Sequence, residues 1–228
     1  KGLVNKFGSK RVFDTPLSED GMTGISIGAA LAGLRPVHTH VRMEFLILAM
    51  NQLINIAAKA RYMYGGAVTV PIVIRTLIGD GWGAQHSQGL HSLFANIPGL
   101  KIVMPSTPYE AKGFLIQAIR DNNPVIFIEH FKLYAEKGHV PKKPYVIPFG
   151  KAVVRKKGND ITLVGLSWMN VECQNAARHL EKTGVSAEII DPLSLNPLDI
   201  NTIIKSVEKT GKLIVVDAAW TSCGFSAE

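Results

Sequence analysis

Two short motifs carry the residue types in this chain that are best suited to chemistry. Residues 14–21 read Asp-Thr-Pro-Leu-Ser-Glu-Asp-Gly and place Glu19 at the start of a Gly- and Ala-rich stretch. Residues 83–88 read Gly-Ala-Gln-His-Ser-Gln and place His86 before an apolar helical segment. A carboxylate facing a bound heterocycle and an imidazole facing a substrate would form a proton-transfer pair. Since α/β folds build sites beyond strand ends, we expect a strand before each motif.

Each of these residues also has an ordinary structural interpretation. Glu19 could be a simple charge or cap at a helix start. His86 could be a surface histidine, although the Gly-rich approach over residues 79–83 favours a flexible loop that delivers an imidazole. His38 and His40 share one strand face and with His86 could suggest a metal. No Cys or suitably spaced carboxylate completes such a set, so the sequence disfavours histidine ligation.

Composition limits the function classes. The chain has 228 residues, of which 46% are hydrophobic, and this predicts one large or two ordinary domains with a substantial core. The net charge of +7 includes the clusters 142–143 and 155–157, which lack interleaved aromatic residues. We therefore interpret them as solvated surface and expect no nucleic acid. Two Cys favour a reducing compartment, and no apolar run is long enough for a membrane span.

The elements that must position the motifs alternate between strand-like and helical runs. We expect strands at 11–14, 36–41, 70–74, 100–104, 124–128, 161–166, 187–190 and 213–216. We expect helices at 21–34, 44–63, 90–96 and 108–121, and within 168–182 and 198–209. Such alternation predicts an α/β fold with doubly wound, largely parallel sheets.

The Pro- and Lys-rich stretch in the middle of the chain reads as a linker. We therefore predict a first domain over residues 1–136, a linker over 137–150 and a second domain over 151–228. The chain starts without Met and stops within a further unit, so we expect the first domain to lack its N-terminus and the second to be incomplete.

These motifs, taken in order, resemble a known family. The two opening motifs are followed by Pro-Gly-Leu-Lys-Ile-Val-Met-Pro at 98–105, Ala-Ile-Arg-Asp-Asn-Asn-Pro-Val at 118–125 and Asn-Pro-Leu-Asp at 196–199. The chain resembles the β subunit of the E1 component of 2-oxo acid dehydrogenase complexes, of the pyruvate, branched-chain and acetoin types. The resemblance runs over essentially the whole chain, and several separated motifs are more specific than any one alone.

The resemblance implies an oxidoreductase that uses thiamine diphosphate. It implies a transketolase-like pyrimidine-binding domain followed by a transketolase C-terminal-like domain. Glu19 would contact the aminopyrimidine ring and activate the cofactor, Phe45 would pack against that ring, and His86 would serve proton transfer during acyl transfer to a lipoyl group. Some relatives hold a structural K⁺ at the positions matching Ile72, Ala118, Ile119, Asp121 and Asn123.

The resemblance also implies partners. An E1 α subunit would complete an α2β2 heterotetramer and hold Mg²⁺ and the diphosphate, and an E2 lipoyl acyltransferase would accept the product. Gly-Asp-Gly at 79–81 and Asn-Asn at 122–123 are similar to the two parts of the Mg²⁺ motif of thiamine-diphosphate enzymes, but here they are too far apart to form it. We therefore expect no Mg²⁺ site in this chain. The turn at 120–124 is either an ordinary helix end or a carbonyl-rich loop for a hard cation.

The sequence does not determine the substrate, and it allows other functions of the same fold. Thr39 stands where many relatives have an acidic residue, and the segment before His86 is shorter than in pyruvate-specific relatives, so the 2-oxo acid is undetermined. A transketolase- or deoxyxylulose-phosphate-synthase-like transferase and a non-catalytic scaffold of the same fold are alternatives. The expected compartment is the cytoplasm of a bacterium or archaeon, or the mitochondrial matrix or plastid of a eukaryote.

Overall fold

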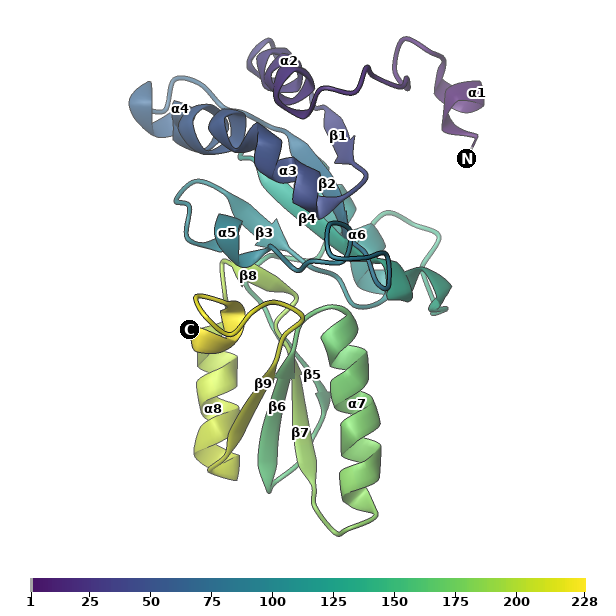
Figure 1. The fold of residues 1–228 in the computed structure, drawn as a ribbon, viewed down its shortest axis with the longest axis vertical. Helices are drawn as coiled ribbons and strands as arrows, with labels where there is room; N and C mark the ends of the chain where they lie inside the picture. Colours follow the sequence, from purple (N-terminus) through teal and green to yellow (C-terminus); the bar gives the residue numbers. More distant parts are fainter. Residues whose placement is uncertain (1) are drawn as a thin grey trace.

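Two β-sheets with helices packed against them make up residues 2–228, the part that the computed structural model describes (Figure 1). The first sheet has the order β1-β2-β4-β3-β8 and the second the order β5-β7-β6-β9. The first contains β1 (Val37–His40), β2 (Val73–Ile78), β4 (Val125–His130), β3 (Lys101–Val103) and β8 (Ser194–Asn196). The second contains β5 (Val153–Lys156), β7 (Ala187–Asp191), β6 (Ile161–Gly165) and β9 (Leu213–Val216).

The α-helices follow the predicted alternation. They are α1 (Leu3–Phe7), α2 (Glu19–Leu31), α3 (Met43–Leu46), α4 (Ala58–Met63), α5 (Ser92–Ala95), α6 (Pro108–Arg120), α7 (Trp168–Glu181) and α8 (Ile200–Thr210). Pairing is parallel except for β8 on β3 and β5 on β7. The predicted α/β class with two largely parallel sheets is therefore confirmed.

The central strands of the first sheet, β2 and β4, are buried on both faces because most of their side chains are apolar. Val73 and Val125 pack with Phe114 of α6 in one cluster. The alternate residues Ile74 and Ile126 join a larger cluster that contains residues of the α3–α4 segment and α5. Successive strand residues point to opposite faces, so one strand contributes to both clusters.

The second sheet is sandwiched in the same way between α7 and α8, which lie on opposite sides of it in Figure 1. Leu163 and Ile189 pack with Cys173 of α7. Their strand neighbours Val164 and Ile190 instead belong to the large cluster that extends from the first domain. The two domains thus share a continuous apolar core at their boundary.

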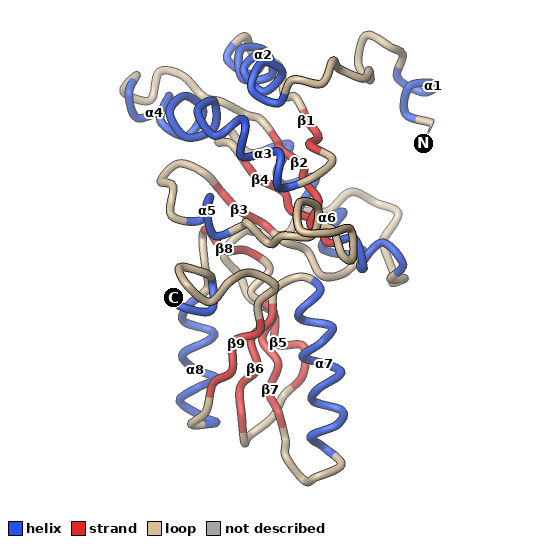
Figure 2. The backbone as a smooth tube through the Cα atoms, in the orientation of Figure 1, coloured by secondary structure: helices blue, strands red, loops and turns tan. Residues whose placement is uncertain are grey.

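Three predicted elements need correction. Residues 11–14 form no strand; the segment between α1 and α2 is loop in Figure 2, so Glu19 does not follow a strand. The helix predicted at 44–63 begins at Met43 and includes a 3-10 turn, Ile47–Ala49, and a π-helical stretch, Asn51–Ala57. The strand predicted at 70–74 runs from Val73 to Ile78, because its pairing with β4 sets the register.

Strands β5 and β8 were missed. Each has three or four residues and mixes polar with apolar side chains, so neither shows a readable period. Strand β8 lies within the second domain's sequence, but it pairs with β3 of the first sheet. The predicted linker is irregular but docked: Tyr145 stacks on Tyr109 of α6 with ring centroids 4.6 Å apart. Among residues 2–228, no helix combines the length and apolar character needed to cross a bilayer.

Candidate functional site

Glu19 is the first residue of α2, directly after Ser18, which has extended backbone geometry. Its side chain is partly exposed, and no hydrogen bond or ion pair engages its carboxylate within residues 2–228. Small residues let α2 lie close to the neighbouring helical stretch; a Cβ on Gly24 would lie 3.4 Å from the Gln52 side chain. The carboxylate is therefore held at a helix start, near another element, with its acceptor capacity free.

The structure brings Phe45 and His86 together, although 41 positions separate them in the sequence. Their rings meet edge to face with centroids 5.5 Å apart and an interplanar angle of 64°. Phe45 is 36% exposed and His86 is partly exposed, so one side of this ring pair faces solvent. The pair offers an apolar face and an imidazole at the same place. No hydrogen bond or ion pair joins Glu19 to His86 in the described residues.

The loop that carries His86 follows β2, as predicted, and several contacts hold it. The buried carboxylate of Glu44 accepts a hydrogen bond from the backbone N–H of Gln88 at 2.6 Å. The backbone N–H of Trp82 donates to Ser87 Oγ at 2.9 Å, and the Arg42 guanidinium lies 4.2 Å from the Trp82 ring centroid. The backbone at Gly79 also packs closely against the loop, because a Cβ there would lie 1.9 Å from the carbonyl oxygen of His86. The sequence did not single out Glu44, whose only signal was a carboxylate directly before Phe45 in an otherwise apolar run.

One histidine of β1 links the sheet to α2. His40 is buried and its Nε2 lies 3.0 Å from Thr23 Oγ1 of α2, which ties α2 to the sheet. Its ring lies 4.5 Å from that of His38. Burial, with a smaller contribution from the nearby His38, lowers the pKa of His40 to about 4. At the end of β4, burial likewise lowers the pKa of His130 to about 4.

The five positions matched to a K⁺ site gather where α6 turns into β4 and β2 begins. Ile72 O accepts from Val125 N at 3.0 Å, which brings Ile72 to this turn. The Arg35 guanidinium donates to the carbonyls of Ile119 and Asp121, each at 2.9 Å. The Asp121 carboxylate pairs with Lys101 and accepts from the backbone and side-chain N–H groups of Asn123 at 2.9 and 2.8 Å; Ala118 lies one helical turn earlier.

These oxygen-rich groups have the chemistry that a hard cation requires. Two of the carbonyls already accept from Arg35, but a carbonyl oxygen has two lone pairs and can accept again. The turn is therefore compatible with a bound monovalent cation. It is already stabilised by the positive charges of Arg35 and Lys101. Burial opposes ionisation of Asp121, but Lys101 and Asn123 outweigh it and hold its pKa below the ordinary value.

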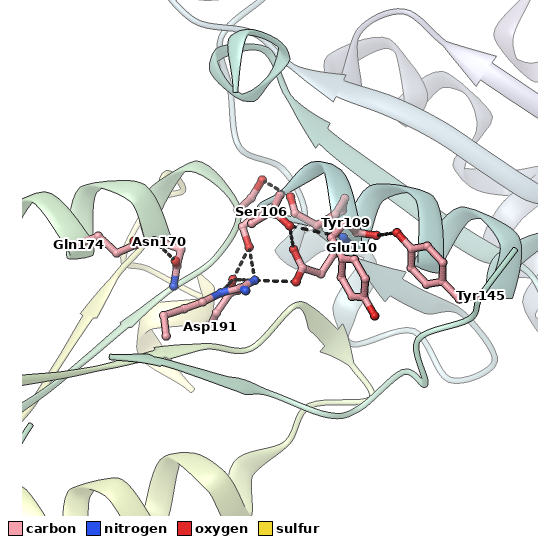
Figure 3. Close-up of polar contacts among 11 residues, drawn as sticks. Ser106, Tyr109, Glu110, Tyr145, Asn170, Gln174 and Asp191 are labelled. Atoms are coloured by element: carbon pink, nitrogen blue, oxygen red, sulfur yellow. Dashed lines mark hydrogen bonds and ion pairs between the residues drawn. The ribbon is translucent and has the colours of Figure 1, made fainter. Parts of the chain in front are cut away.

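A second cluster of charged residues lies between the domains, where Figure 3 shows Ser106, Glu110 and Asp191 converging. The Arg155 guanidinium of β5 donates to Asp191 Oδ2 at 2.8 and 3.0 Å and lies 3.1 Å from Glu110 Oε1 of α6. Ser106 Oγ donates to the same Asp191 oxygen. Burial raises the pKa of Asp191 to about 6, although Arg155 opposes the rise. The cluster joins the two domains through one guanidinium.

This cluster corrects the interpretation of residues 155–157 as solvated surface. The side chain of Arg155 is only 18% exposed, and Lys156 pairs with Glu181 at 2.7 Å. Strand β5 was not predicted from the sequence. Successive side chains of a strand point to opposite sides, so one residue of a basic run can face solvent while the next faces a neighbouring domain.

The residues present fit the pyrimidine end of thiamine diphosphate. A nitrogen heterocycle needs a hydrogen-bonding carboxylate and an apolar surface for its ring. Glu19 provides a carboxylate without another partner, and the half-exposed ring of Phe45 provides the surface. His86 lies against that ring. No group of three His, Cys, Asp or Glu side chains in residues 2–228 could hold a metal ion.

Comparisons with known proteins agree with this arrangement. The family described as transketolase, pyrimidine binding domain, matches residues 1–137, and the family described as transketolase, C-terminal domain, matches residues 150–228. The acetoin:2,6-dichlorophenolindophenol oxidoreductase subunit beta of Cupriavidus necator is 49% identical over 100% of this chain and 68% of that protein. The pyruvate dehydrogenase E1 component subunit beta of Bacillus subtilis is 46% identical over 100% of this chain and 71% of that protein.

A solved structure described as a split gene transketolase, inactive beta4 tetramer, has the same fold. The TM-score is 0.80 at 21% identity, and the match covers 94% of this chain and 67% of that one. The two domain matches and the full-length similarity to named subunits identify the family. The chain belongs to the family of β subunits of E1-type 2-oxo acid and acetoin dehydrogenases, which is built from a transketolase pyrimidine-binding domain and a transketolase C-terminal domain.

Proposed function

We propose that this chain is the β subunit of a thiamine-diphosphate-dependent E1 enzyme that acts on a 2-oxo acid or on acetoin. The observation that carries the proposal is the carboxylate of Glu19, unpartnered within residues 2–228, on a helix that packs against the helical stretch following Phe45, whose ring meets that of His86. Similarity to both acetoin and pyruvate dehydrogenase β subunits supports the reaction class.

The chain's own residues would do three things. Glu19 would accept a hydrogen bond from the aminopyrimidine, Phe45 would cover the face of that ring, and a ring nitrogen of His86 would hold or release a proton beside the substrate. When bound, thiamine diphosphate supplies the carbanion chemistry that cleaves the bond next to a carbonyl. A 2-oxo acid then loses carbon dioxide, and its acyl group passes to a lipoyl disulfide, which becomes one thioester and one thiol.

The partners follow from the proposed reaction. An E1 α subunit would hold the diphosphate and Mg²⁺, in an α2β2 assembly, and an E2 lipoyl acyltransferase would accept the acyl group. Large apolar side chains support an assembly because they are exposed in the single chain, with Ile25 at 64% and Tyr62 at 90%. We further propose that the turn at Asp121 and Asn123, with Ile72, Ala118 and Ile119, binds K⁺. The proposed domain limits are 1–136 and 151–228, joined by 137–150.

The decisive test compares Glu19→Gln with Asp20→Asn in the complex of the full chain and its α subunit. Both residues lie in the first turn of α2, so each change removes one negative charge from the same helix start. We expect Glu19→Gln to lower turnover at least about 100-fold, because the amide cannot act as a base toward the cofactor. Asp20→Asn should keep near wild-type turnover.

Both variants should unfold within about 0.5 kcal/mol of wild type, since neither side chain is buried. Isothermal titration with thiamine diphosphate separates cofactor binding from turnover. Near wild-type turnover of Glu19→Gln would exclude the proposed role of Glu19.

Substrate choice needs a direct assay of the same complex. Carbon dioxide release from several 2-oxo acids and dye reduction with acetoin should identify one preferred substrate. Transfer of a two-carbon ketol group to an aldose phosphate would instead favour the transketolase-like alternative. Absence of every thiamine-dependent reaction in the assembled complex would favour a scaffold.

A further inference from the structure

The loop that carries His86 is held by the second domain as well as by the first. It ends at His91, which directly precedes α5. His91 Nε2 lies 3.0 Å from Oδ1 of Asp217, the residue that follows β9. The two side chains are 1% and 3% exposed, so this pair is buried at the domain boundary. In Figure 1 the yellow segment after β9 runs back toward the first domain.

An independent observation places the backbone of the loop against the same segment. A Cβ on Gly89 would lie 3.1 Å from the carbonyl oxygen of Ala218 and 3.3 Å from the nitrogen of Ala219. These distances are shorter than ordinary van der Waals contact, so a side chain at position 89 would push the loop away. The loop therefore rests directly on the second domain, three residues after His86.

Within residues 2–228, Asp217 is the hydrogen-bond partner of the His91 ring. His91 Nδ1 and Asp217 Oδ2 are buried and have no hydrogen-bond partner within residues 2–228. Burial opposes ionisation of Asp217, but its interaction with His91 and the backbone N–H groups of Ala219 and Ala218 outweigh burial and keep the pKa of Asp217 below the ordinary value. Loss of Asp217 would leave the His91 ring buried and unpaired, and loss of His91 would leave the buried Asp217 carboxylate with backbone N–H groups alone; either change favours a shifted loop.

On its other side the loop is fixed to the first domain. Glu44 accepts from the backbone of Gln88, and the ring of His86 packs on Phe45. The loop is thus tied to the first domain at His86 and Gln88 and to the second domain at His91. Since small displacements of a reacting group are costly in rate, both ties matter for chemistry at His86.

We propose that Asp217, acting through His91, is a positioning residue with which the second domain holds the His86 loop in its working geometry. This inference rests on the proposed role of His86. Asp217 need not touch cofactor or substrate. Its effect should appear in kcat and in the mobility of the loop, whereas affinity for thiamine diphosphate, which depends on Glu19 and Phe45, should stay unchanged.

The test uses Asp217→Ala, His91→Ala and the double variant in the assembled complex, with Asp217→Asn as the conservative variant. Each alanine change should lower kcat about tenfold, and the double variant should be no slower than either, because all three remove one contact. The Asn side chain can still accept from His91 and should recover most of the rate. Amide hydrogen exchange of residues 79–89 should accelerate in the alanine variants and stay slow in Asp217→Asn.

Glu110→Gln is the matched control, because it removes a carboxylate from the other ion pair between the domains without touching the loop. It should lower the thermal midpoint but leave kcat and loop exchange unchanged. The inference is overturned if Asp217→Ala leaves both loop exchange and kcat unchanged, or if the effects of the two single changes on kcat add in the double variant. It is also overturned if Glu110→Gln lowers kcat and accelerates loop exchange as the alanine variants do. Wild type without any thiamine-dependent turnover would contradict the proposed function, and the exchange measurement would still decide the positioning of the loop.

Discussion

The Arg155 cluster at the domain boundary and the candidate site differ in how their charged groups are paired. Around Arg155, one guanidinium serves Asp191, Glu110 and Ser106, all buried. In the candidate site, by contrast, no hydrogen bond or ion pair within residues 2–228 engages the Glu19 carboxylate or the His86 imidazole, and the His86 ring packs on Phe45. A cluster in which each carboxylate is paired with a guanidinium stabilises the fold, whereas a site must keep hydrogen-bonding capacity for a ligand. The difference therefore distinguishes structural from functional charge in one chain.

The largest expected effect sharpens the structural side of this comparison. Arg155→Met should lower the free energy of unfolding by about 3–5 kcal/mol, because it leaves two buried carboxylates without a counter-charge. Chemical denaturation of the purified chain measures it. Arg178→Met, on an exposed face of α7, is the control and should change stability by less than about 0.5 kcal/mol. A small effect at Arg155 would mean that the cluster is not a stabilising one.

A second prediction concerns acid stability. His40 and His130 have folded pKa values of about 4, below the ordinary 6.5, because burial disfavours their charged forms. The unfolded chain therefore binds more protons between pH 6.5 and 4, and stability is lost as the pH falls through that range. Each group contributes up to about 3 kcal/mol to the loss.

The corresponding variant is His40→Gln, which keeps a hydrogen-bonding group near Thr23 but cannot titrate. Its unfolding free energy should depend less steeply on pH between 6.5 and 4 than that of wild type. The exposed His139→Gln serves as the control and should keep the wild-type slope. Identical slopes for all three proteins would show that His40 takes up its proton equally easily in the folded state.

The functional side of the comparison is tested at His86. His86→Asn should lower acyl transfer to the lipoyl domain about 100-fold, because the amide cannot transfer a proton, while the thermal midpoint stays close to that of wild type. The control is His139→Asn in the linker, which should keep full activity. If His86→Asn loses stability rather than turnover, His86 belongs with the structural group.

The smallest expected effect is at the turn around Asp121. Replacement of K⁺ by choline should lower the thermal midpoint by about 1–3 °C, because an ion bound only to the folded state stabilises it. Arg35 and Lys101 already supply positive charge there, so the effect is modest. Equal midpoints in K⁺, Na⁺ and choline would exclude a bound cation. The Ile119 carbonyl would then interact with Arg35 and not with a cation.

Sequence alone determined the α/β class, the order of most elements and the local context of the motifs. Apolar β-branched runs such as 124–128 specify buried parallel strands, and a Thr-Pro start followed by an amphipathic pattern specifies α6. These signals are local, because each depends on the period of a few neighbouring side chains. The motifs likewise singled out Glu19 and His86, and the resemblance carried by those motifs added Phe45.

Tertiary structure decided what those residues contact. Sequence could not show that Phe45 meets His86, that Asp217 pairs with His91, or that Arg155 is buried between two carboxylates. Strand β8 and the pairing of β5 were equally hidden, since a three-residue strand gains its stability from its neighbour and not from its own pattern. Contacts between distant segments depend on how two sheets pack, and no local period records that packing.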